Sequence, residues 1–178
     1  MKESVKPFVV LSISLLLILL QTAGAFYSKS LALFTYAGLI ISDAFSLLPK
    51  LANLNDIYEG FRKAQFISII LNASVLFILA LIMISRTLNA ITPPKIINIP
   101  LAEIITSIVF AGLVICFFIY GKFIFTALMS LLIITGFSVP VLKKTVLLDS
   151  YLSIFFAVLI MINSVLLIKN SFKMLKNK

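Results

Sequence analysis

Apolar runs of membrane length follow one another along almost the whole chain, separated by short polar segments. Hydrophobic residues make up 62% and charged residues 12% of the 178 residues, whereas soluble domains have about half apolar and a quarter charged residues. Since a spanning helix needs about 20 apolar residues, residues 1–178 predict a single transmembrane domain without a C-terminal cytoplasmic domain. We expect helices at residues 7–26, 30–48, 64–85, 101–120, 123–142 and 146–168. The predicted fold class is an all-α integral membrane protein, a six-transmembrane-helix bundle.

The first apolar run has two interpretations. Lys2 and Lys6 precede it and the small residues 23–25 follow it, which is the pattern of a cleaved signal peptide. Read through to Phe26, the run is also long enough to span. We favour a retained helix, because it makes the number of helices even.

The basic residues indicate topology and exclude nucleic acid as the partner. The net charge is +9, but Lys and Arg stand at the ends of the apolar runs, where they orient helices and meet lipid headgroups. With six spans, ten of these residues fall on the side of both termini and five on the other. The positive-inside rule therefore predicts a multi-pass protein of the cell membrane with both termini in the cytoplasm.

The composition argues against catalysis. The sequence has no histidine and one cysteine, Cys116, so it lacks the commonest zinc ligand and the usual proton carrier at neutral pH. No serine, cysteine or lysine is paired with a base that would activate it as a nucleophile. We therefore expect a protein that is not an enzyme and that holds no cofactor.

Asp43 is the chemically most unusual residue, because it is a carboxylate well inside an apolar run. Such a residue costs about 2.5–3.5 kcal/mol on insertion scales, and it usually faces a bundle interior or a water-filled cavity. The alternative is a structural role, with Asp43 protonated or tethered to a neighbouring lysine. Helix rise predicts that further polar residues lie in the same inner half of the membrane: Ser12, Ser14, Asn72, Cys116, Thr126 and Asn163.

Two other acidic residues, Glu103 and Asp149, fall near the opposite ends of their helices. At that depth Glu103 is too far from Asp43 to share a site. For Asp149 we favour a structural role, in which the carboxylate stabilises the N-terminus of its own helix through the dipole.

Several stretches resemble the membrane domain of the cation diffusion facilitators, which are six-helix cation–proton antiporters. Residues 30–33 and 42–44 are similar to the family's SLALLADAGHMLSDA motif, and residues 60–65 to its FGxxRAE entry to helix three. Asn72 with residues 89–94 resembles the helix-three asparagine and NPP-type loop, and residues 148–153 resemble the LDPLLS start of helix six. The resemblance implies a divalent metal cation as substrate, exchanged for protons, and a homodimer.

The sequence departs from the family at the transport site, which the family builds from an HxxxD or DxxxD pair on helix two and another on helix five. Asp43 matches the second member of the first pair, but Leu39 takes the place of its partner. The helix-five pair falls on Lys122 and Thr126, and residues 123–142 contain no acid.

Two hypotheses follow from this comparison. In the first, the chain is a divergent transporter whose cation binds Asp43 with help from Asn72, Thr126 and backbone carbonyls. In the second, it is a transport-inactive relative that acts as a structural or regulatory membrane partner, with Lys122 as the charge partner that fills the site.

Overall fold

All six elements in the described part of the chain are helices. The computed structural model describes residues 5–47, 59–90, 97–121, 123–138 and 146–176. The helices are α1 (Lys6–Ser28), α2 (Leu31–Phe45), α4 (Glu59–Ala90), α5 (Ile99–Tyr120), α6 (Ile124–Ser138) and α7 (Val146–Lys176). The chain is therefore an all-α integral membrane protein, as the apolar runs predict.

The helices differ in their capacity to cross a bilayer. Within the described residues, α1, α4, α5 and α7 each contain a segment long and apolar enough to span a membrane. The apolar helices α2 and α6 are shorter, at 15 residues each, which corresponds to about 22 Å of rise. We expected these two to reach residues 48 and 142, but α2 ends at Phe45, and residues 139–145 lie outside the described part.

Helices α4 and α7 extend furthest beyond their apolar runs. Helix α4 begins at residue 59 rather than 64, and α7 continues to residue 176 rather than 168. The additional residues are rich in Lys, Arg and Glu, which favour helix as much as most apolar residues do. Hydropathy marks the part of a helix that meets lipid, and it says little about where the helix ends.

Short turns fix the order of the helices in space. Lys29 ends α1 in the left-handed conformation, and Ser30 begins α2 by accepting a hydrogen bond from the Leu33 amide. Gly121 (φ 71°) ends α5 in the same left-handed way, which glycine adopts without steric cost. These turns make α1–α2 and α5–α6 packed neighbours.

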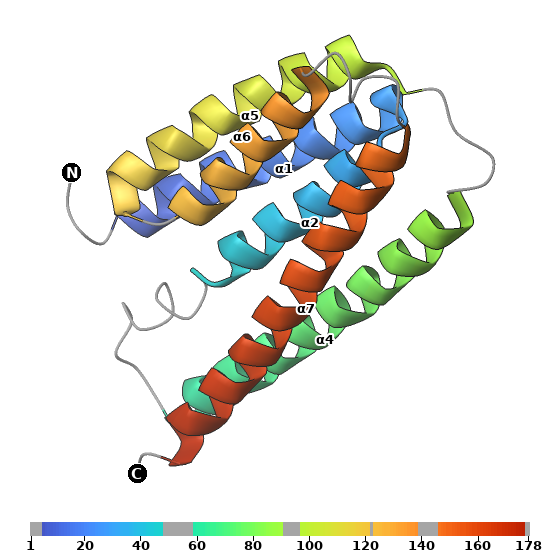
Figure 1. Cartoon of the computed structure of the whole chain (residues 1–178). Coiled ribbons are helices and arrows are strands. Elements are labelled where there is room, and N and C mark those ends of the chain that lie inside the picture. Colours follow the sequence, from blue (N-terminus) through green and yellow to red (C-terminus); the bar gives the residue numbers. More distant parts are fainter. Residues whose placement is uncertain (1–4, 48–58, 91–96, 122, 139–145, 177–178) are drawn as a thin grey trace.

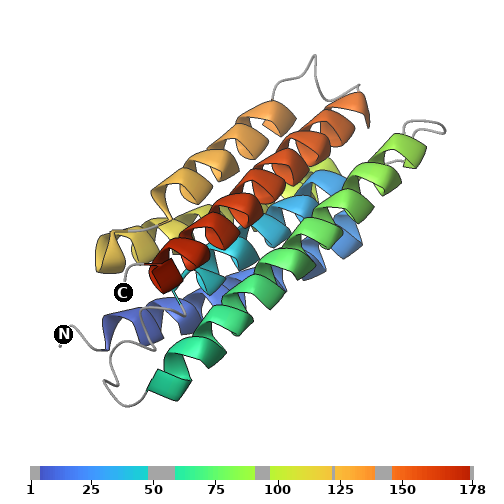
Figure 2. The same ribbon diagram turned by 90° about the horizontal axis from the view of Figure 1, so that it is seen from below.

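Helix α2 is the centre of the bundle. It contacts α1, α4, α6 and α7, and Figure 1 shows α1, α5 and α6 on one side of it and the α4–α7 pair on the other. Figure 2 shows the same arrangement from below, with α4 at the opposite side of the bundle from α6. A helix that is apolar all round is expected to be buried, and ten of the fifteen α2 residues are buried.

The outer helices present apolar side chains to their surroundings. On α1, for example, Phe8, Leu16 and Leu19 are each more than 60% exposed. An apolar outer surface of this kind fits contact with lipid tails rather than water. A polar side chain inside the bundle therefore has to find its partner within the protein, either on its own helix or on a neighbouring one.

Candidate functional site

Asp43 lies in the last turn of α2 and meets the first turn of α6. It is partly buried, whereas Thr126 on α6 is fully buried. The Thr126 hydroxyl donates a hydrogen bond to Asp43 Oδ2. Thr126 is also two residues after Ile124, where α6 begins, so the carboxylate lies near the positive end of the α6 dipole. Two of the three predicted ligand residues are thus in direct contact.

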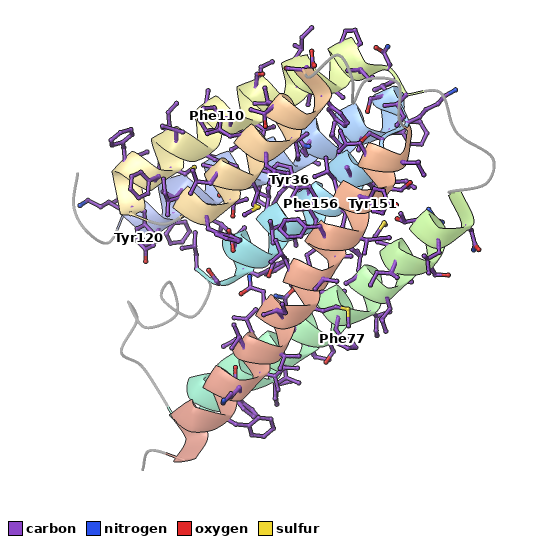
Figure 3. All side chains as sticks on the ribbon, in the orientation of Figure 1. Tyr36, Phe77, Phe110, Tyr120, Tyr151 and Phe156 are labelled. Atoms are coloured by element: carbon purple, nitrogen blue, oxygen red, sulfur yellow. The ribbon has the colours of Figure 1, made fainter. Side chains whose placement is uncertain are left out.

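Tyr36 ties the same part of α6 to α2 from two turns away. Its hydroxyl donates to the Thr126 carbonyl oxygen at 2.7 Å and shares a further hydrogen bond with the Ser130 hydroxyl. The ring is fully buried and packs on Phe156 of α7, with 5.5 Å between ring centroids. Figure 3 shows Tyr36 and Phe156 next to each other in the centre of the bundle. Because both ends of the Tyr36 side chain are held, it fixes the position of Thr126 relative to α2.

A third contact joins α2 to α7 beside Asp43. The Asn163 amide donates to the hydroxyl of Ser42 at 3.2 Å. Asn163 and Thr126 therefore approach neighbouring residues of α2 from two different helices, and the expected polar layer connects α2, α6 and α7.

Other predicted members of the layer lie elsewhere. Asn72 is partly buried on α4, whereas the described hydroxyl that donates to Asp43 is that of Thr126. Cys116 of α5 is buried, and the buried Ser14 of α1 donates to the Val10 carbonyl of its own helix. Ser12 is exposed and donates to the carbonyl of its own helix. Lys122, the predicted charge partner of the site, lies outside the described residues.

Asp149 forms a second polar cluster at the opposite end of α2. It is in the first turn of α7, as predicted, but its carboxylate accepts hydrogen bonds from α2. Oδ2 accepts from the Leu31 amide at 2.8 Å, and Oδ1 accepts from the Ala32 amide at 3.1 Å and from the Ser30 hydroxyl. Asp149 therefore caps the N-terminus of a neighbouring helix, with the charge sign that the dipole favours.

Hydroxyl groups continue this contact towards the middle of the bundle. Ser153, one turn after Asp149, shares hydrogen bonds with Thr35 of α2 at 2.7 Å and with Thr87 of α4 at 2.9 Å. All three residues are fully buried. This small network holds α2, α4 and α7 together, which interhelical hydrogen bonds commonly do inside membranes.

The chemistry of the Asp43 site is that of one carboxylate among neutral oxygen atoms. Hydroxyl, carbonyl and carboxylate oxygens are ligands for hard cations and for protons. Among the residues that the structure describes, no three His, Cys, Asp or Glu side chains come together as a metal-binding group. At the Asp43 site, the sequence interpretation missed Tyr36 and Ser130, for which no motif or spacing gave a signal.

The fold and the apolar surface together define an integral membrane protein with a polar site inside its helix bundle. In comparisons with known proteins, no family model and no curated protein matches this chain.

Proposed function

We propose that the protein is a cation-efflux-like membrane transporter, in which a cation and protons exchange at Asp43. The observation that carries the proposal is the Asp43 carboxylate, held within the bundle by the Thr126 hydroxyl. An intramembrane acid is expensive and is by default a sign of an ion or proton pathway. The family resemblance of residues 30–44 adds a divalent metal cation as the cargo to test first.

The residues around Asp43 suggest how one site serves both species. When Asp43 is ionised, the positive end of the α6 dipole and the Thr126 hydroxyl stabilise its charge. A bound cation takes over that stabilisation, and the Thr126 hydroxyl turns its lone pairs to the cation. When the cation leaves, a proton neutralises the carboxylate. Asn72 and backbone carbonyls are the further neutral ligands in this proposal.

The distribution of basic residues supplies the orientation. With ten Lys and Arg residues on the side of the termini, we place both termini in the cytoplasm and Asp43 nearer to the cytoplasmic face. The assembly proposed from the family resemblance is a homodimer, which would form through the helices.

A second candidate is a transport-inactive relative that acts as a structural or regulatory membrane partner. The single carboxylate favours it, because a divalent cation in a protein site usually meets more than one negative charge. In this case Thr126 and Lys122 satisfy Asp43 permanently, and Asp43 only holds helices together.

Transport in proteoliposomes distinguishes the two candidates. The wild type is tested with Zn, Mn, Fe and Co ions and an internal pH dye, beside Asp43→Asn, which has the same shape but cannot ionise. Glu103→Gln is the matched control, because Glu103 lies at the opposite end of the bundle, where it accepts a bond from Ser138. We expect ion uptake coupled to proton movement in the wild type and the control, and its loss in Asp43→Asn. No flux of any ion through folded wild-type protein would refute transport.

A further inference from the structure

Gln21 is a fully buried amide inside the bundle whose polar atoms have no hydrogen-bond partner among the described residues. Its relative exposure is 0%, and neither Nε2 nor Oε1 makes a hydrogen bond within the described part of the chain. Leaving such a group unsatisfied destabilises the folded protein, because the amide gives up its hydrogen bonds to water without replacing them. Native proteins leave few polar groups in this condition, and an exception calls for an explanation such as a bound water or ion.

The position of Gln21 on α1 is one where an apolar residue is expected. The buried residues of α1 recur at steps of three and four, with Ala25 beside the stripe: Pro7, Val10, Ser14, Leu17, Gln21, Gly24 and Ser28. This is the spacing of a packed helix seam. The other polar members of the stripe have hydrogen-bond partners, because Ser14 and Ser28 donate to carbonyls of their own helix at 2.7 and 3.4 Å. Gln21 makes no such bond within the described part of the chain.

Tight contacts with α5 hold Gln21 inside. One turn before it, Leu17 lies where a Cβ on Gly112 would come within 2.6 Å of its Cδ2. One turn after it, a Cβ on Gly24 would come within 2.6 Å of Ile105 Cγ2. The two glycines thus allow α1 and α5 to approach closely on both sides of Gln21, which is fully buried between these contacts.

Gln21 also lies at a depth that continues the Asp43 site towards the other face. Measured from the α1–α2 turn at Lys29, helix rise places Tyr36 at about 10 Å, Gln21 at about 12 Å and Asp43 at about 21 Å. Helices α1 and α2 pack against each other, so these depths refer to one pair of adjacent antiparallel helices. A species leaving Asp43 for the opposite face has to pass the level of Gln21.

We propose that the Gln21 amide binds water, either free or in the hydration shell of the transported cation, and so forms a second polar site beyond Asp43. A primary amide offers one acceptor oxygen and two N–H donors, which matches a water molecule, and its oxygen is a ligand for a hard cation. The binding of a hydrated cation rests on the proposed transport function, but the binding of a free water molecule does not.

Cysteine reactivity tests whether water reaches the Gln21 site, and it does not require transport. In a Cys116→Ala background, Gln21→Cys is compared with Leu17→Cys, which replaces a buried residue on the same face one turn away. The probe is Ag⁺, followed by denaturation and alkylation of the remaining thiols, counted by mass spectrometry. Because buried thiols without access are inert, we expect Gln21→Cys to react roughly ten-fold faster than Leu17→Cys. Equal rates would overturn the proposal.

A second variant separates a binding role from a packing flaw. Gln21→Leu removes the unsatisfied amide at nearly constant volume, so its thermal stability is expected to equal or exceed that of the wild type. Cation flux in the same variant should fall by roughly an order of magnitude, since a polar binding site on the cation's path is lost. If the wild type transports a cation and Gln21→Leu transports it equally fast, Gln21 does not bind the hydrated cation on its path. Absent flux in the wild type would instead refute the proposed function, and the thiol rates would still decide whether water reaches Gln21.

Discussion

Removing the Asp149 carboxylate should be the most damaging single change at the end of the bundle that carries the α1–α2 turn. Its two oxygens accept from the Ser30 hydroxyl and from the amides of Leu31 and Ala32, and it is only 4% exposed. A hydrogen bond to a charged group contributes about 1.5–3 kcal/mol, and its loss leaves the donor unsatisfied. Because such contributions are not additive, we expect Asp149→Ala to cost about 3 kcal/mol.

The conservative variant gives a graded result for a geometric reason. In Asp149→Asn one oxygen can still accept from Ser30 and Ala32, but the new amide N–H₂ faces the N–H of Leu31, which places donor against donor. We expect a loss of about 1–2 kcal/mol, intermediate between the wild type and Asp149→Ala. Neutral interhelical hydrogen bonds in membranes contribute about 0.6 kcal/mol on average, so both effects should exceed that of an ordinary hydroxyl.

Thermal unfolding in detergent measures both variants. For a chain of this size, 3 kcal/mol corresponds to a fall in Tm of roughly 6–12 °C. Thr135→Ala is the control, because this exposed hydroxyl donates to carbonyls of its own helix, and its Tm should stay within about 2 °C of the wild type. An Asp149→Ala Tm as close to the wild type as that of the control would refute the capping role.

Two further predictions concern helix contacts. Tyr36→Phe keeps the packing on Phe156 but removes the hydroxyl that holds Thr126 and Ser130. It should therefore lower the free energy of unfolding by about 1 kcal/mol and also reduce flux. Unchanged stability would contradict the observed hydrogen bonds. Gly24→Ala places a methyl group against Ile105 and should lower the free energy of unfolding by about 1–3 kcal/mol. In an Ile105→Ala background that loss should be smaller by about 1 kcal/mol or more. Additive effects in this double-mutant cycle would contradict the close contact.

The fold class followed from the sequence because the solvent imposes it. In lipid, backbone groups must be satisfied within the segment, so the apolar runs predict helices with little ambiguity. The central position of α2 did not follow, because all the runs are strongly apolar and hydropathy cannot distinguish a helix surrounded by protein from one surrounded by lipid. Which helix is central depends on packing between distant parts of the chain.

The polar contacts show the same division. Depth along the helices placed Asp43 and Thr126 at similar levels, and the structure joins them. Depth could not predict that Asp149 caps α2 instead of serving only its own helix, because that bond joins residues more than a hundred positions apart. Gln21 did have a signal, since the three-and-four spacing of the α1 seam shows a polar residue at a core position. Tyr36 had none, because its hydroxyl finds its partners only once α2 and α6 are packed.

Proton release on cation binding is the most direct test of the claim that Asp43 exchanges a cation for a proton. The purified protein is held in weakly buffered detergent at a pH where Asp43 carries its proton, and each cation is added while the pH is recorded. The account predicts release of about one proton per protein, its loss in Asp43→Asn and its retention in Glu103→Gln. Equal release from the wild type and Asp43→Asn, or none from either with every cation, would contradict it.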